Sequence, residues 1–228
     1  MADAILGWPE LTQKNSYTSP RHYRTQDPIL FQGEIPPSAL IVSSGFVVSY
    51  TINNNGDEQI IGFFAAGDVI PIEWIFGRCP VSLYYYRAFT DCSLVSVNRN
   101  EFLDQIKSTP GLASQLLEKF VSGYIGATVH IHALEHSHSR EKLIKLFHYL
   151  VLRFGVQDTA QSGMYTIPFP LTHAQLASMI GLTRETVAME TVKLKKLGAI
   201  NYKRGEYTIN LSVLIQSVGS EEFDALQL

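Results

Sequence analysis

The stretch that decides the fold covers residues 171–200 and reads LTHAQLASMIGLTRETVAMETVKLKKLGAI. Thr172, followed three residues later by Gln175, has the pattern of a capping box, which starts a helix by satisfying free backbone groups. Gly181 ends that short helix, because glycine readily adopts the left-handed conformation of a tight turn. Thr183 then caps the next helix. The stretch therefore predicts two helices joined by a glycine turn.

Two helices in this arrangement form a helix-turn-helix, whose second helix lies in the major groove of DNA. We place this recognition helix at residues 183–197, with an apolar face formed by Val187, Leu194 and Leu197. An arginine can donate two hydrogen bonds to guanine, and a glutamate can accept one from cytosine. The expected base contacts lie at the start of the helix and are Arg184, Glu185, Ala188 and Met189. Packing of Met189 and Val192 against the following hairpin is the alternative.

That hairpin follows Ile200, where residues 201–202 and 207–209 flank Lys203-Arg204-Gly205-Glu206. The pattern predicts a wing whose basic tip contacts phosphate. The expected phosphate contacts carry a hydroxyl or a positive charge, and they are Thr172, Thr183, Thr186, Lys193, Lys203 and Arg204. For Lys193 a solvated surface charge is the alternative.

The distribution of charge favours the same end of the chain. Residues 1–138 contain 8 basic and 13 acidic side chains, whereas residues 139–228 contain 10 basic and 8 acidic side chains. Within residues 171–210 the count is 6 basic and 3 acidic. The overall net charge of −3 argues against a protein that binds nucleic acid indiscriminately, but the positive segment is where a polyanion would dock.

Residues 28–98 read as short strands separated by Gly, Pro and Asn. The expected strands lie within 39–50, 59–64 and 84–97, and residues 53–57 (Asn-Asn-Asn-Gly-Asp) predict a hairpin turn. Gly33, Gly45, Gly56 and Gly67 recur about every dozen residues, which is typical of a small antiparallel barrel or jelly roll.

The pattern changes to helices after Asn98. Apolar residues at spacings of three and four form one stripe, which consists of Leu112, Leu116, Phe120, Tyr124, Ala127, Ile131 and Leu134. We expect this stripe to pack against a second copy of the chain or against its own barrel. Residues 136–139 are the expected hinge, and a further amphipathic helix with apolar residues from Leu143 to Phe154 ends at Gly155.

At this point the sequence resembles the CRP/FNR transcription regulators. The residues that carry the resemblance are Gly181-Leu182-Thr183, Arg184-Glu185-Thr186-Val187, Leu194, Gly198 and Ile200, which are similar to the family's recognition-helix signature. Residues 46–50, 53–57, 59–64 and 67–68 resemble the family's barrel strands. The family commonly has a base-reading arginine where Met189 stands and a leucine where Thr191 stands, so we expect a different target site and a weaker core position.

The resemblance implies an α+β fold with an N-terminal antiparallel β-roll, a long dimerisation helix and a C-terminal winged helix-turn-helix. We assign residues 1–106 to the β-roll sensor domain, 107–136 to the dimerisation helix and 137–228 to the DNA-binding domain. The expected function is a sequence-specific transcription regulator, with double-stranded DNA and a second copy of the chain, bound through helix 112–134, as partners. RNA polymerase is a further expected partner, and the operator is expected to be pseudo-palindromic.

The phosphate-binding cassette of cyclic-nucleotide-binding relatives is altered in this chain. Those relatives carry a Gly-Glu pair and an Arg-Ser pair, whose arginine neutralises the cyclic phosphate. Here Glu73 matches the glutamate only with a shift of one residue, and Val81-Ser82 replaces Arg-Ser. We therefore expect no cyclic nucleotide and leave the effector open. The residues expected around an effector pocket are Glu73, Trp74, Ser82, Tyr84 and Arg87; a well-packed barrel is the alternative reading of the aromatic ones.

We expect neither a cofactor nor a metal. Cys79 and Cys92 are too few for an iron–sulfur cluster or a four-thiolate zinc site. The histidines at 130, 132, 136 and 138 are expected as polar surface residues, with a divalent ion between His132 and His136 as the alternative. No apolar run approaches the ~20 residues of a membrane span, and residues 1–10 lack a signal-peptide pattern. A cytoplasmic protein is expected.

Two other classes of protein compete with a DNA-binding regulator. A cupin-like barrel enzyme needs histidines and a carboxylate on neighbouring strands, but residues 28–98 contain no histidine, so we expect no catalytic residues. A ligand-binding or interaction module that has lost DNA binding would have a disrupted recognition helix, whereas this one is intact.

Overall fold

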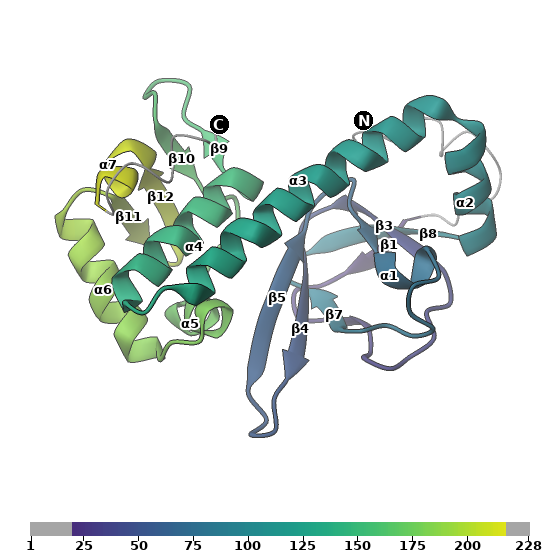
Figure 1. Ribbon diagram of the computed structural model, residues 1–228, viewed down its shortest axis with the longest axis horizontal. Helices are drawn as coiled ribbons and strands as arrows, with labels where there is room; N and C mark the ends of the chain where they lie inside the picture. The colour runs from purple at the N-terminus through teal and green to yellow at the C-terminus, as the bar shows by residue number, and fades with distance from the viewer. Residues whose placement is uncertain (1–19, 218–228) are drawn as a thin grey trace. The chain divides into compact units, whose positions relative to one another are not determined.

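The computed structural model describes residues 20–217 of the chain. Contacts divide the chain into two compact units, residues 1–120 and 121–228. The boundary falls within helix α3 (Pro110–Glu135), and strands dominate the first unit whereas helices dominate the second (Figure 1). The proposed domain limits of 106 and 136 are close to the ends of helices α2 (Arg99–Ser108) and α3.

The first unit contains two four-stranded antiparallel sheets, with strand orders β1-β8-β3-β6 and β2-β7-β4-β5. The strands are β1 (Arg21–Tyr23), β2 (Pro28–Leu30), β3 (Ala39–Ser44), β4 (Val47–Ile52), β5 (Glu58–Phe64), β6 (Val69–Ile70), β7 (Tyr85–Ala88) and β8 (Cys92–Val97). The predicted β-roll is therefore present. The expected strand within 84–97 is in fact two strands, because the chain turns at residues 89–91, where Thr90 Oγ1 accepts a hydrogen bond from Phe46 N.

Both faces of strand β3 are buried, which explains its unbroken apolar run. Side chains alternate across a strand, so Leu40 and Val42 face one core while Ala39 and Ile41 face another. The first core lies between the two sheets. The second includes Ile75 of the one-turn helix α1 (Ile72–Ile75) and Phe102 of α2.

The hairpin predicted at residues 53–57 joins β4 to β5. Asn53 Oδ1 accepts hydrogen bonds of 2.9 Å from both Asn55 N and Asp57 N, and Gly56 has a positive φ of 85°. An asparagine side chain that accepts bonds from the following backbone closes a turn of this kind.

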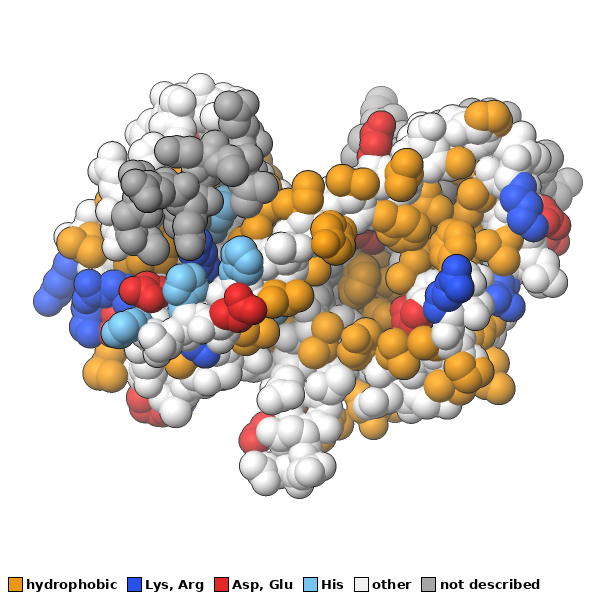
Figure 2. Space-filling model, in the orientation of Figure 1, with side chains coloured by type: hydrophobic (Ala, Val, Ile, Leu, Met, Phe, Trp, Pro, Cys, Tyr) orange, Lys and Arg blue, Asp and Glu red, His pale blue; other side chains and the backbone are white. Residues whose placement is uncertain are grey.

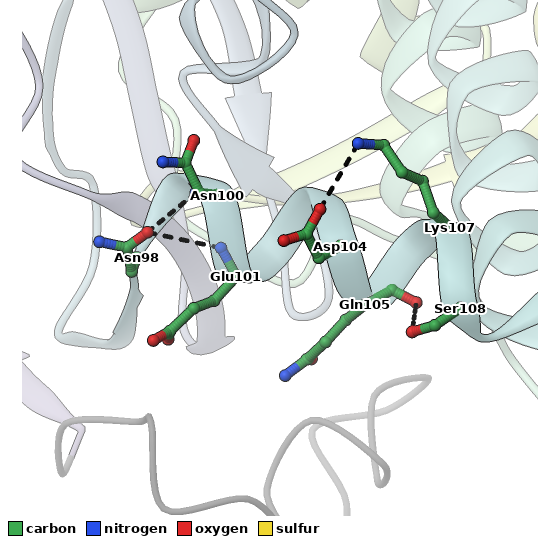
Figure 3. Close-up of polar contacts among 7 residues, drawn as sticks. All are labelled: Asn98, Asn100, Glu101, Asp104, Gln105, Lys107 and Ser108. Carbon is green, nitrogen blue, oxygen red and sulfur yellow. Dashed lines mark hydrogen bonds and ion pairs between the residues drawn. The ribbon is translucent and has the colours of Figure 1, made fainter.

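Helix α2 is a separate element that lies mostly within residues assigned to the β-roll, and its bounds were not predicted. Its cap, Asn98, accepts hydrogen bonds from the backbone of Asn100 and Glu101, as Figure 3 shows. The same figure shows the exposed ion pair between Lys107 and Asp104, which at 3.5 Å contributes little to stability. Thr109 then separates α2 from α3.

The apolar stripe of α3 changes its environment along the helix. Leu112 and Leu116 are buried in the second core of the first unit. Farther along, Val129 is buried but six large apolar side chains are exposed, namely Leu117, Phe120, Val121, Tyr124, Ile131 and Leu134. Figure 2 shows hydrophobic side chains following this helix. The chain's own barrel thus covers only the first members of the stripe.

No helix within residues 20–217 combines the length and apolar character needed to cross a membrane.

The second unit packs helices on a four-stranded antiparallel sheet of order β11-β12-β10-β9. Its remaining elements are α4 (Ser139–Phe154), β9 (Val156–Gln157), β10 (Met164–Thr166), α5 (His173–Ile180), α6 (Arg184–Lys196), β11 (Ile200–Lys203), β12 (Glu206–Asn210) and α7 (Leu211–Gln216). The apolar face predicted between Leu143 and Phe154 is buried, and Gly155 ends α4 as expected. Strands β9 and β10 are only two and three residues long, too short for a clear sequence pattern, and were not predicted.

Candidate nucleic-acid interface

Helices α5 and α6 form the predicted helix-turn-helix, and the predicted caps are present. Thr172 Oγ1 accepts a hydrogen bond of 3.2 Å from Gln175 N, and Gln175 Oε1 accepts one of 2.8 Å from Thr172 N, which completes the capping box. Gly181 ends α5 in the left-handed region at φ 64°. Thr183 then accepts a bond from Thr186 N and starts α6.

The side chains of α6 divide into a buried and an exposed set. Four are buried: Val187, Glu190, Thr191 and Leu194. The predicted base contacts lie on the other side of the helix, where Arg184 and Glu185 are exposed and Ala188 is half-buried. Met189 is 58% exposed and Val192 is 44% exposed, so neither is packed away against the wing.

One expectation about the apolar face of α6 is wrong. Leu197 is 53% exposed, because the helix ends at Lys196 and the chain turns away at Gly198. Thr191 is fully buried, as expected for a position that usually carries leucine, but its hydroxyl has no hydrogen-bond partner among residues 20–217. An unpaired buried hydroxyl is costly, which agrees with the prediction of a weaker core position.

The predicted wing is the two-residue hairpin between β11 and β12. Arg204 and Gly205 both have positive φ angles, 53° and 85°, and Lys203 pairs with Glu206 across the turn. This is the geometry of a type I′ turn, which matches the twist of the flanking strands. Lys203 and Arg204 are both exposed at the tip.

The base of the wing is connected to both helices of the motif. The ring of Tyr202 lies edge-on to His173 at the start of α5, with 5.5 Å between ring centroids. Lys195 of α6 places its ammonium 5.0 Å from the same ring and donates to Tyr202 O at 3.4 Å. These contacts hold the wing beside the motif, so the threonines at the helix starts and the basic wing tip belong to one unit.

Lys193 differs from the other predicted phosphate contacts. Its ammonium lies 2.5 Å from Glu190 Oε1, and the other oxygen of that carboxylate accepts a bond of 3.2 Å from Arg140 Nε of α4. Sequence reasoning missed this cluster. The feature of the sequence that could have revealed it is Glu190, an acidic residue between Val187 and Leu194 on the buried face of the helix.

The expectation that the four histidines lie on the surface is wrong for His130. It is 9% exposed, its ring stacks on Tyr149, and its Nε2 lies 2.8 Å from Met179 O. Burial lowers the pKa of His130, although the bond to Met179 O opposes this shift. Lys142 of α4 donates to the next carbonyl, Ile180 O, at 3.5 Å. Helices α3 and α4 therefore both hold the last turn of α5.

The other three of these histidines, at 132, 136 and 138, lie at the end of α3 and the start of α4. His136 and His138 both approach Glu141 Oε2, at 3.2 and 3.6 Å, while His132 is exposed on α3. Among residues 20–217 no group of three His, Cys, Asp or Glu side chains has a geometry that could hold a metal ion.

Three of the five predicted effector residues lie together in the barrel. Glu73 Oε1 accepts a bond of 3.3 Å from Leu83 N, and the fully buried Ser82 donates its hydroxyl to Tyr84 O at 2.8 Å. Burial and the Glu73 carboxylate raise the pKa of Tyr86 beside them. Trp74 lies apart from this group, packed on the second core with Arg99 over its ring.

Arg87 is directed away from these residues. Along β7, Tyr86 and Ala88 are buried in the core between the sheets, so the alternation of the strand places Arg87 on the opposite face. There it pairs with Glu58 at 2.6 Å and lies 4.4 Å from the ring of Tyr50. An open pocket of about 440 Å³ beside β1 and β8 includes none of the five predicted effector residues.

Comparisons with known proteins agree with this geometry. The family described as "Cyclic nucleotide-binding domain" matches residues 20–109, and that described as "Crp-like helix-turn-helix domain" matches residues 141–214. The chain is 31% identical over 193 residues to the fumarate and nitrate reduction regulatory protein of Escherichia coli. These aligned residues are 82% of this chain and 73% of that protein. The chain belongs to the CRP/FNR family.

Other proteins are similar to this chain over most of its length. Electron transport regulator A of Shewanella oneidensis is 30% identical over 183 residues, which are 79% of this chain and 70% of that protein. The structure of FixK2 from Bradyrhizobium japonicum matches with a TM-score of 0.70 at 22% identity, covering 87% of this chain and 96% of that one. The structure of a CooA mutant from Carboxydothermus hydrogenoformans matches with a TM-score of 0.73 at 16% identity, and the match covers 92% of this chain and 94% of that one.

Membership of the CRP/FNR family and the helix-turn-helix geometry together define the class of function. The chain is a DNA-binding transcription regulator and not an enzyme, so the cupin-like alternative is not favoured. The predicted α+β fold, with an N-terminal β-roll and a C-terminal winged helix-turn-helix, is confirmed.

Proposed function

We propose that the protein acts as a homodimer that reads a pseudo-palindromic operator with one α6 helix in the major groove of each half-site. The observation that carries the proposal is the exposed start of α6, from which Arg184, Glu185 and Met189 project. The turn before this helix is fixed at one end by Gly181, which ends α5, and at the other by Thr183, which caps α6. Two-fold symmetry then requires half-sites one helical turn apart, about 34–36 Å.

In this proposal Arg184, Glu185, Ala188 and Met189 contact bases. The exposed thioether of Met189 suits a thymine methyl group, since neither carries a hydrogen-bond donor. Thr172, Thr183, Thr186, Lys203 and Arg204 contact phosphate, supported by their positions at two helix starts and at the wing tip.

Dimerisation is proposed through the exposed apolar side chains of α3, which include members of the stripe and the neighbouring Leu117. Leu117, Tyr124 and Ile131 are 62%, 74% and 54% exposed and follow one another at intervals of seven. A seven-residue repeat of apolar side chains is the pattern by which two helices pack along each other. The domain limits proposed from the sequence, 1–106, 107–136 and 137–228, place this surface in the dimerisation helix.

For the effector we propose that DNA binding does not require a cyclic nucleotide. The buried hydroxyl of Ser82 donates to Tyr84 O, and Arg87 is paired with Glu58 on the far face of β7, so neither side chain is poised to bind a cyclic phosphate. RNA polymerase is proposed as a further partner because the chain is a transcription regulator.

The experiment that tests the proposal is a selection of random duplex DNA by the purified, ligand-free protein at a stated salt near physiological ionic strength. Enrichment of an inverted repeat is the expected result. Enrichment of a single half-site would contradict the dimeric reading. If no motif emerges, the selection is repeated with cell extract: a motif there would show that an effector is required, and continued absence would refute sequence-specific binding.

A further inference from the structure

The buried carboxylate of Glu190 is the one charged group on the inner side of α6. Glu190 is 7% exposed and interacts with two cations, Arg140 of α4 at 3.2 Å and Lys193 one turn along α6 at 2.5 Å. Burial by itself would raise the pKa of Glu190, but the bonds from Lys193 and Arg140 lower it below its usual value. The carboxylate is therefore ionised at neutral pH and neutralises part of the charge of both partners.

These side chains lie beside the proposed path of the DNA backbone. Thr186, Glu190 and Lys193 follow at i, i+4 and i+7, which places them along one side of a helix. Thr186 is a proposed phosphate contact at the beginning of that side. Lys193 is 50% exposed and Arg140 is 46% exposed, so both cations reach solvent while the carboxylate between them does not.

Stability alone does not explain a buried carboxylate at this position. An ion pair that loses its hydration gains little or nothing over well-packed apolar side chains, so a cluster of this kind is weak evidence for stabilisation. Its electrostatic effect on DNA binding has a definite sign. Each cation that neutralises a phosphate releases counterions and strengthens binding to DNA of any sequence.

We propose that Glu190 is a positioning residue that ties α6 to α4 through Arg140 and withholds Lys193 from DNA phosphate, which limits sequence-independent DNA affinity. The proposal rests on the proposed use of α6 as the recognition helix. Weakening the binding to random DNA while the base contacts are unaffected raises the ratio of specific to non-specific affinity. A regulator must find its operator among a large excess of other sites, so this ratio matters more than affinity alone.

The test is the salt dependence of binding to a random duplex, measured for the full chain by fluorescence anisotropy between about 50 and 200 mM KCl. For Glu190→Gln we expect tighter binding at low salt and a slope of log K against log salt that is steeper by roughly 2, because each freed lysine of a dimer contributes about 0.9. Adding Lys193→Gln to that variant should remove the increase.

Two further variants keep the inference falsifiable. Lys193→Gln alone changes an exposed side chain, and it should leave the native slope nearly unchanged; a decrease of roughly 2 would show that Lys193 already binds phosphate and would overturn the inference. Glu141→Gln is the matched control, since it removes a carboxylate from α4 that pairs with histidines rather than with Lys193. An equal gain from Glu141→Gln would reduce the effect to general charge and refute the role of Glu190.

Failure of this inference is distinguishable from failure of the proposed function. If the native protein enriches an inverted repeat and Glu190→Gln does not steepen the slope, only the role of Glu190 is refuted. If the native protein selects no sequence with or without extract, the proposed reading of DNA by α6 fails first. Circular dichroism of each variant separates both results from loss of folding, because unfolding lowers binding without steepening its salt dependence.

Discussion

The exposed stripe on α3 makes a quantitative prediction about the dimer. Ile131 is 54% exposed in the single chain. Full burial of an isoleucine side chain contributes about 1.5–3 kcal/mol, so covering the exposed half contributes about 1 kcal/mol, and a symmetric dimer contains two copies. Ile131→Ala should therefore weaken dimerisation by about 2 kcal/mol, which corresponds to a roughly 30-fold higher dissociation constant.

Sedimentation equilibrium of the native protein and the variant measures this constant directly. The matched control is Ile35→Ala, which removes a side chain that is 70% exposed and lies between β2 and β3. Both substitutions should leave thermal stability at low protein concentration almost unchanged, because neither side chain is in a core of the single chain. Equal dissociation constants for Ile131→Ala and the native protein would refute the placement of the dimer interface on this stripe.

Three further predictions concern other parts of the molecule. Arg184→Ala should weaken binding to the selected operator by ~1–3 kcal/mol and relax the preference at one base pair, as measured by competition with single-base variants; an equal loss on random DNA would make Arg184 a phosphate contact. Gly45→Ala should lower the free energy of unfolding by at least about 2 kcal/mol in urea titrations, because Gly45 has φ 73° and a Cβ there would collide with Asp91 O and Cys92; an unchanged midpoint would contradict this. Burial and the nearby charge of Lys145 lower the pKa of His148 to about 4, so the unfolded state binds more protons between pH 6.5 and 4 and about 3 kcal/mol of stability should be lost as the pH falls through that range. His148→Gln should flatten this part of the pH profile relative to the native protein, whatever its effect at pH 7.

The caps and turns were predictable because they depend on neighbouring residues. The capping box of Thr172 and Gln175, the turn at Gly181 and the wing tip at Arg204-Gly205 each involve only a few consecutive positions, and all are present. The hairpin at residues 53–57 belongs to the same class. For these features the local backbone preference and the final structure agree.

The environment of individual side chains was less accessible. Periodicity correctly identified the stripe on α3 but not which members the barrel covers. His130 looked like its three neighbouring histidines, yet only the structure shows its contact with Met179 O, 49 residues away. Arg87 stands in the sequence next to the altered phosphate cassette, but the pleat of β7 directs it to Glu58.

The sequence alone was enough to predict the secondary structure around the motif, the class of fold and the exposed face of α6 that we propose contacts DNA, since each follows from spacing, capping and turn chemistry within a few residues. The folded structure was needed to show that Glu190 meets Arg140 across 50 residues, that His130 holds the end of α5, and that most of the α3 stripe is uncovered in a single chain. The physical reason is that burial and ion pairing depend on which distant segments the packing of the core brings together, whereas a helix cap or a turn is complete within its own stretch of chain.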